Sequence, residues 1–318
     1  MNFFKVNSFM RFLGQHKIYT VIEIFGLSVS LMFVILIVTD ARQELSTDSF
    51  HPNAERIYML GNERMNMSAY GIGERVKEHY PEIEEYCYVT DCILLGSGHM
   101  AVNKNDELYN SKVSFVSENF FRFFAFPLTV GSEEYVLANP HNAVISQSYA
   151  KRTFPGEDPI GKSFKIDSVS YTVNGVMNDI TNSVIKENDI LVRIETLRQF
   201  RPDMDGHTFN NAINTNLFVL ERQGSSLAEK AESMRDYFKE VYWIYEKGTL
   251  EEVQFVPITQ AYYSHHDGYM YNKGDKKLVM ILLAVGMLIL IFAVINYINL
   301  TTAQTGFRAK EMATRSLL

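Results

Sequence analysis

The stretch from Leu278 to Leu300 constrains the fold most, because its 23 positions carry no charged side chain. A helix of that length spans ~34 Å at a rise of 1.5 Å per residue, which is enough to cross a bilayer. A buried core helix of a soluble protein is usually shorter, and here Arg308, Lys310 and Arg315 follow the stretch. We therefore predict a transmembrane helix at residues 277–300.

A second apolar run, Ile18 to Thr39, is longer than the 7–15 residues of a signal-peptide core, which favours a retained transmembrane helix at 18–39. Residues 1–17 contain no acidic group and place apolar side chains at helical spacing. This pattern predicts an amphipathic helix in the membrane interface. The basic residues Lys5, Arg11 and Lys17 place the N-terminus in the cytoplasm by the positive-inside rule.

The region between the two apolar runs contains no other stretch long enough to span a membrane. Residues 40–276 are therefore expected to form one large extracytoplasmic domain, and residues 301–318 a cytoplasmic segment. Positions 41–275 hold 34 acidic and 22 basic residues, and the whole chain has a net charge of −7. This balance argues against nucleic acid as a partner.

The outer domain alternates helical and strand patterns, which predicts an α+β fold. Residues 226–242 form the strongest helical pattern, with a capping box at Ser226 and Glu229. A second helix is expected at residues 70–80, and Ser117 and Ser146 are expected to cap two further helices. Strands are expected at residues 112–116, 143–145, 164–166, 170–176, 191–194, 217–220 and 253–256.

One segment, Gly156 to Ser163, matches the phosphate-loop pattern G-x-x-x-x-G-K-[ST]. Such a loop needs a strand before it and a helix after it, so that backbone N–H groups point at phosphate. Here the preceding pattern is helical and the following pattern is that of a strand. The segment is therefore predicted to be a helix-to-strand turn that binds no nucleotide.

The other reactive side chains give no catalytic or metal-binding pattern. Cys87 and Cys92 would lie ~16 Å apart in an extended chain, which predicts two buried free thiols unless the chain turns between them. His265, His266 and Asp267 are interpreted as a solvated loop, because adjacent strand residues point to opposite faces. The sequence predicts no cofactor, no metal site and no enzymatic activity.

Three groups of segments together resemble one family of membrane proteins. They are IEIFGLSVSL with DSFHPNAERIYM; FVSENFFRFFAFPLTVGSEEYVLANPHNAVISQSYAKRTFPGEDPIGKSFKID with YTVNGVMNDI; and AVINYINLTTAQTGFRAKEMATR. The chain resembles an FtsX-like ABC-transporter permease of the MacB type over nearly its whole length. Glu23 departs from the pattern, because such permeases often carry Asn there. The family also continues into further spans after the position of Leu318, which implies a truncated chain.

The resemblance implies a non-catalytic permease subunit that couples ATP hydrolysis by a separate cytoplasmic ATPase to movement of the outer domain. The residues expected to contact the ATPase are Arg308, Lys310, Glu311 and Arg315 in the segment 301–318. Without the resemblance, these residues would be interpreted as a solvated basic flank. The intramembrane polar candidates are Glu23, Asn296 and Asn299.

The same resemblance implies a place and partners for the chain. The expected location is the bacterial inner membrane, with the outer domain in the periplasm. A homodimer or a paired permease is expected, together with a periplasmic or outer-membrane partner.

Two alternatives have the same topology. A membrane receptor or sensor also places a ligand-binding domain between two spans, and it would continue with heptad helices after the second span. A membrane-anchored hydrolase is disfavoured because no catalytic pattern is present. The substrate stays open among a peptide, a drug and a lipoprotein, as does a role in signalling.

Overall fold

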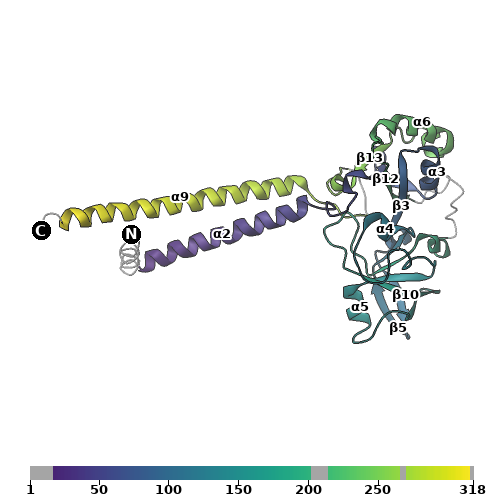
Figure 1. Ribbon diagram of the computed structural model, residues 1–318, viewed down its shortest axis with the longest axis horizontal. Coiled ribbons are helices and arrows are strands. Elements are labelled where there is room, and N and C mark those ends of the chain that lie inside the picture. The colour runs from purple at the N-terminus through teal and green to yellow at the C-terminus, as the bar shows by residue number, and fades with distance from the viewer. Residues whose placement is uncertain (1–16, 202–213, 266–269, 316–318) are drawn as a thin grey trace. The chain divides into compact units, whose positions relative to one another are not determined.

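The computed structural model describes residues 17–201, 214–265 and 270–315. The chain divides into two compact units, which we call the helix pair (residues 1–45 with 275–318) and the outer domain (residues 46–274) (Figure 1). The amphipathic helix predicted at residues 1–17 lies outside the described residues, apart from Lys17.

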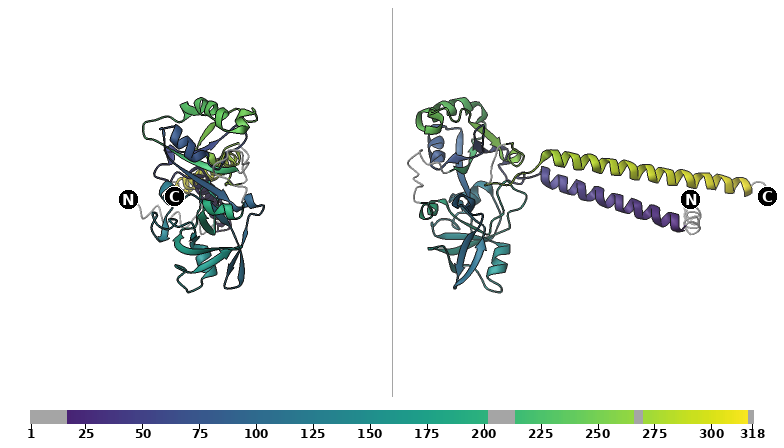
Figure 2. Two further views of the ribbon diagram at one scale, coloured as in Figure 1. Left: turned by 90° about the vertical axis from the view of Figure 1, so that its right-hand side faces the viewer. Right: turned by 180° about the vertical axis from the view of Figure 1, so that it is seen from behind.

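The helix pair consists of α2 (Lys17–Leu45) and α9 (Lys276–Arg315), which lie side by side in opposite directions (Figures 1 and 2). Both are long and apolar enough to cross a membrane, over Ile24–Leu45 and Lys276–Asn299. Only 6% and 17% of these stretches is buried, whereas the core helix of a soluble protein is mostly buried. The exposed apolar surface is therefore that of two transmembrane helices, which lipid would cover.

Small side chains let the two helices approach each other. A Cβ atom built on Gly286 of α9 would lie 3.2 Å from Cγ2 of Ile37 on α2. Ala41 on α2 and Ala293 on α9 are also buried. Small residues at a transmembrane interface allow such close packing.

The outer domain is built on a single mixed sheet. Its main strand order is β13-β1-β12-β3-β6-β11-β8-β10-β9-β4-β5, with β2 beside β12 and β7 beside β10. The pairs β6–β11 and β8–β10 are parallel, and the other pairs are antiparallel. The strands are β1 Ile57–Gly61, β2 Ser68–Ala69, β3 Ile83–Asp91, β4 Met100–Lys104, β5 Glu107–Ser111, β6 Val113–Val116, β7 Leu128–Val130, β8 Asn142–Ser146, β9 Ser163–Ile166, β10 Val169–Met177, β11 Ile190–Arg193, β12 Asn214–Glu221 and β13 Gln254–Pro257.

Short helices accompany the sheet. Figure 1 shows α3 and α6 near β12 and β13 at one end of the outer domain, and α5 near β10 and β5 at the other. The α-helices are α3 Ile72–His79, α4 Phe120–Phe124, α5 Gln147–Thr153, α6 Ala231–Val241, α7 Trp243–Glu246 and α8 Ile258–Ala261. The 3-10 helices are η1 Ala54–Arg56, η2 Cys92–Leu95, η3 Ile194–Gln199 and η4 Ala228–Lys230.

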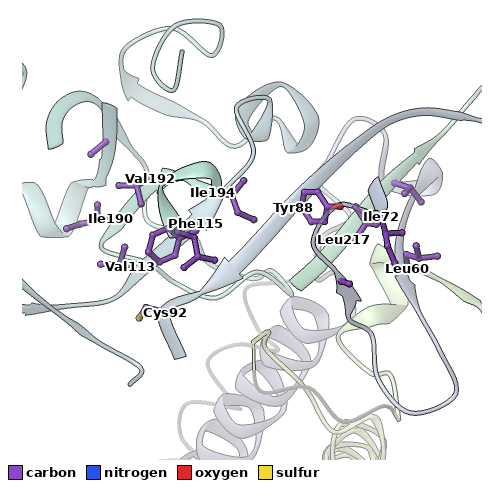
Figure 3. Close-up of a cluster of buried hydrophobic side chains, with 14 of the residues drawn as sticks. Leu60, Ile72, Tyr88, Cys92, Val113, Phe115, Ile190, Val192, Ile194 and Leu217 are labelled. Carbon is purple, nitrogen blue, oxygen red and sulfur yellow. The ribbon is translucent and has the colours of Figure 1, made fainter. Parts of the chain in front are cut away.

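The central strands are buried on both faces, because successive side chains point to opposite sides of a sheet. On β12, Leu217 belongs to one hydrophobic cluster and Phe218 to the other. On β11, Val192 belongs to the first cluster and Leu191 to the second. Figure 3 shows residues of the first cluster: Val113 and Phe115 of β6 lie near Ile190 and Val192 of β11, whereas Leu217 of β12 lies near Tyr88, Ile72 and Leu60. The outer domain therefore has a core on each side of its sheet.

Most of the predicted elements are confirmed, and two predicted caps are wrong. Ser146 accepts the N–H of Tyr149 and caps α5 as expected. The hydroxyl of Ser117 instead accepts the N–H of Tyr88 at 2.8 Å, and α4 begins later, at Phe120. Near Ser226, the N–H of Leu227 donates to the buried carboxylate of Glu221, and α6 begins only at Ala231. In both places a contact with a residue of a strand replaces the predicted cap: Tyr88 of β3 for Ser117, and Glu221 of β12, six residues back along the chain, for Leu227.

The helix-to-strand turn predicted at Gly156–Ser163 is confirmed. It joins α5 to β9, and Gly156 and Gly161 have φ values of 76° and 77°, which glycine adopts without strain. The N–H of Gly161 donates to Val173 O at 2.8 Å, and that of Lys162 donates to Pro159 O at 3.1 Å. These amides are therefore engaged within the protein, which excludes a phosphate cradle.

Both cysteines are free and buried, as the sequence predicted. Burial raises the pKa of the Cys92 thiol to about 11 and raises that of Cys87 further. Because the thiolate is the reactive form, we expect both thiols to resist maleimide labelling in the folded protein. Mass spectrometry should find full labelling only after denaturant is added. Rapid native labelling at either position would contradict the buried placement.

Several buried tyrosines should make the outer domain sensitive to alkali. Burial raises the pKa of Tyr86, Tyr171 and Tyr242 to about 12. A raised pKa in the folded state means that the stabilisation is complete below the unfolded value, near pH 10, and is lost as pH rises through the folded value. We expect the unfolding midpoint in denaturant to fall between pH 10 and 12. An unfolding midpoint that stays constant from pH 10 to pH 12 would contradict the burial of these tyrosines.

Candidate coupling site

The helix α9 continues well past the hydrophobic stretch. It is one uninterrupted helix of 40 residues, about 60 Å long, whereas the hydrocarbon core of a bilayer is about 30 Å thick. The part after Asn299 carries Arg308, Lys310, Glu311 and Arg315. Residues 301–318 were expected to form a separate cytoplasmic segment. As far as Arg315, this segment is instead continuous with the helix of the second span.

The helical register divides these four positions between two faces. At about 100° per residue, Glu311 and Arg315 fall within about 60° of the direction of Arg308, on one face of α9. Lys310 lies about 200° from Arg308, on the opposite face. The four residues share one charged segment, but the helical register places Lys310 on the opposite face of α9 from Arg308, Glu311 and Arg315.

The intramembrane polar candidates lie on both helices. Glu23 is on α2, and Asn296 and Asn299 are three residues apart on α9. Asn296 is partly buried, whereas Asn299 is exposed. Their proposed role in contacts between helices stays a prediction.

A polar cluster lies where the chain enters the outer domain from α2. Asp48, three residues after the last residue of α2, is fully buried and has a φ of 58°. Aspartate is among the few residues that tolerate this left-handed conformation. Its carboxylate accepts the hydroxyl of Ser183 at 2.5 Å and the N–H of Val184 at 2.6 Å. Asp48 is therefore attached to a loop 135 positions further along the chain.

His51 extends this cluster towards α4. Its Nε2 lies 3.1 Å from Oδ1 of Asp48, and its Nδ1 contacts the carbonyl oxygen of Phe124 at 2.5 Å. The rings of Phe50, Phe124 and Phe126 surround the imidazole, with centroids 4.1 to 5.6 Å away. The histidine thus connects the segment after α2 to the end of α4.

The same loop, residues 182–185, also holds the segment that leads to α9, and we call it the junction loop. Asn272, four residues before α9, donates its backbone N–H to Val184 O at 2.8 Å. Its side-chain amide donates to Ser183 O at 3.0 Å and to Ile185 O at 3.3 Å. Both segments that join the outer domain to the helix pair are therefore bonded to four consecutive residues.

Sequence reasoning missed this site, because no local pattern links its members. The only sequence indication was the Asp-x-x-His spacing of Asp48 and His51. The arrangement fastens the segment after α2 and the segment before α9 to one loop of the outer domain. Among the described residues, no group of three or more His, Cys, Asp or Glu could hold a metal ion. Of the predicted His-His-Asp loop, His266 and Asp267 lie outside the described residues.

These features define the class of the protein: a membrane protein with two transmembrane helices flanking an α+β extracytoplasmic domain, as the sequence predicted. Residues 20–237 match the family of MacB-like periplasmic core domains. The chain belongs to this family, which places it among ABC-transporter-type permeases. No curated protein matches the sequence.

One solved structure has a similar fold, and two others are more remotely similar. A permease-protein domain from Porphyromonas gingivalis is 18% identical with a TM-score of 0.55, and the match covers 73% of this chain and 99% of that one. The periplasmic region of MacB from Actinobacillus actinomycetemcomitans is 13% identical with a TM-score of 0.46, covering 64% and 89%. The extracellular domain of the ABC-type transporter YknZ from Gram-positive bacteria is 11% identical with a TM-score of 0.46, covering 63% and 99%.

Proposed function

We propose that this chain is the permease subunit of an ABC transporter whose ATPase is a separate cytoplasmic protein. ATP-driven closure of that partner displaces α9, and the displacement reaches the outer domain through the junction loop. The subunit acts as a homodimer or beside a second permease in the bacterial inner membrane, with its N-terminus in the cytoplasm. That movement exports a peptide, a drug or a lipoprotein-like substrate, or transmits force to it. A periplasmic or outer-membrane protein takes part as a further partner.

The observation that carries this proposal is the unbroken length of α9. A single helix of 40 residues can carry a displacement along its axis, because its backbone hydrogen bonds resist compression. One end of α9 carries the charged residues proposed to meet the ATPase. The other end begins four residues after Asn272, which is bonded to the junction loop. Membership of the MacB-like family supports the same assignment.

Co-purification tests the proposal most directly. The natural full-length protein should be isolated from its own membranes in mild detergent, and its partners identified by mass spectrometry. We expect an ABC ATPase at a stoichiometric level. An intact complex without any ATP-binding subunit would contradict the permease assignment. A gene that continues from Leu318 into a coiled coil or a kinase would instead support the sensor alternative.

We expect variants near the end of α9 to uncouple the transporter. Arg308→Ala and Arg315→Ala should lower the ATP turnover of the complex by roughly tenfold, the size of a typical interface hot spot. Lys310→Ala, on the opposite face, is the matched control and should have the smaller effect if one face of α9 meets the ATPase. Turnover should be measured on complexes with equal amounts of bound ATPase.

The outer domain should not respond to these substitutions. Its unfolding, followed by the fluorescence of the single tryptophan, Trp243, should keep the same midpoint in all three variants. If ATP turnover were unchanged in both Arg308→Ala and Arg315→Ala, the proposed coupling role of these residues would be wrong. The basic residues would then be interpreted as a membrane anchor.

A further inference from the structure

The hydrogen bonds around His51 determine where its protons lie. The carbonyl oxygen of Phe124 can only accept, so the Nδ1 atom that contacts it must carry a proton. The hydroxyl of Ser183 accepts the N–H of Ile185 and donates to Oδ1 of Asp48, so its own proton is already committed. Neither group can supply the proton that the contact between His51 Nε2 and Asp48 Oδ1 requires.

That contact, at 3.1 Å, needs a proton of its own. A neutral imidazole protonated at Nδ1 would present a lone pair at Nε2, facing an ionised carboxylate oxygen. Two facing lone pairs repel, whereas a proton between the atoms makes a charge-assisted hydrogen bond. Asp48 and His51 therefore hold one proton in common, in addition to the proton on Nδ1. The pair is neutral as a unit, whichever atom carries the shared proton.

The surroundings require that neutrality. Both side chains are fully buried, and a single charge without water or a partner is costly to bury. The nearby elements carry charged side chains, but these are engaged or exposed: Arg122 on α4 is exposed, Lys186 after the junction loop pairs with Asp91 at 3.5 Å, and Lys273 beside Asn272 is exposed. Removal of the shared proton would leave a buried anion among the three phenylalanine rings.

We infer that Asp48 and His51 are positioning residues of the transporter, and that their shared proton fastens the segment after α2 to the junction loop and to α4. This inference rests on the proposed coupling function and assigns the transmission of movement to a specific pair. Movement at the end of α2 reaches the sheet by two routes. Asp48 acts on residues 183–184, a few positions before β11, and His51 acts on the end of α4, shortly after β6.

The protonation can be observed directly in the unaltered protein. The full chain, with 15N-labelled histidine and in lipid bilayers, should be studied by nuclear magnetic resonance near pH 7.5. We expect one histidine with a protonated Nδ1 and an Nε2 that shares a proton with a carboxylate, and His51→Gln should remove that signal. The matched control, His141→Gln, removes an exposed histidine and should leave the signal in place. A His51 spectrum with an unprotonated Nε2, together with an ionised Asp48, would overturn the shared proton.

The positioning role needs a separate readout. Hydrogen exchange of the amides of residues 183–185 should be measured by mass spectrometry on the complex with its ATPase, with and without ATP. We expect ATP to change this exchange in the natural protein. Asp48→Asn should speed the exchange roughly tenfold, because an amide oxygen is a weaker acceptor for the Val184 N–H than a carboxylate and the amide cannot share a proton with His51. In the Asp48→Asn variant, adding ATP should not alter the hydrogen exchange of residues 183–185, although the ATPase still hydrolyses ATP.

The possible results separate the two proposals. If Asp48→Asn and His51→Gln both keep the full response to ATP, the positioning role is wrong and the permease assignment stands. If the natural protein shows no response to ATP while its ATPase is active, the coupling function itself fails and the positioning role fails with it. Loss of the response in both variants, with a normal response in His141→Gln, supports the inference.

Discussion

Phe124→Ala should destabilise the outer domain by about 3–5 kcal/mol, the usual cost of removing a buried phenylalanine ring. Phe124 is fully buried, and its ring meets that of Phe218 on β12 edge-to-face, with centroids 5.0 Å apart. It also packs against Phe120 and Phe126, with ring centroids 5.2 and 5.9 Å away, in the second hydrophobic cluster. Alanine would leave a cavity that these rigid rings cannot fill by small shifts.

The fluorescence of Trp243 during denaturant unfolding of the full chain in detergent measures this loss. The matched control is Phe50→Ala, because Phe50 belongs to the same aromatic group but is 47% exposed. Its removal should cost under about 1 kcal/mol. Equal effects of the two substitutions would show that the second cluster does not contribute the expected packing energy.

Tyr88→Phe should also cause a large loss, about 2–4 kcal/mol, although it removes a single oxygen atom. That buried hydroxyl accepts two backbone N–H groups at the start of α3, from Gly71 at 3.0 Å and from Gly73 at 2.6 Å. The first N–H groups of a helix have no partner within the helix, so an outside acceptor must satisfy them. Phenylalanine would leave both donors buried without a partner.

Water cannot easily replace the lost hydroxyl of Tyr88. A Cβ atom on Gly73 would already lie 2.9 Å from that oxygen and 2.5 Å from the ring of Tyr86, so the site is tightly packed. Tyr109→Phe is the matched control, because Tyr109 donates to Glu107 at an exposed edge. It should change the free energy of unfolding by less than about 0.5 kcal/mol. If Tyr88→Phe left the free energy of unfolding unchanged, the two N–H donors would have to find other acceptors.

The sequence predicted the elements of the fold much better than the starts of its helices. Strand patterns such as the apolar residues Ile190, Leu191 and Val192 of β11 follow from the local chain, because burial on both faces leaves a continuous apolar signature. The start of α6 was not predicted, because it depends on a strand residue six positions back along the chain and not on the expected capping box. The carboxylate of Glu221 on β12 engages the N–H of Leu227, where the local pattern predicted a capping box.

The candidate site also has one part that could be predicted from the sequence, the charged end of α9, and one part that could not, the junction loop. The charged end of α9 could be proposed from sequence, because helix, span and basic residues are adjacent in the chain. The junction loop could not, because Asp48 and Ser183 are 135 positions apart, and Ser183 and Asn272 are 89 apart. Such contacts depend on how the sheet returns the chain to one place, and no short pattern records them.

The junction loop also has an evolutionary consequence. Because Asp48 and Asn272 bind neighbouring residues of one loop, the outer domain begins and ends at one place. Topologically it is an insertion between two helices, and a domain whose ends lie close together is readily tolerated as an insertion. A chimaera could therefore receive a different outer domain at these positions.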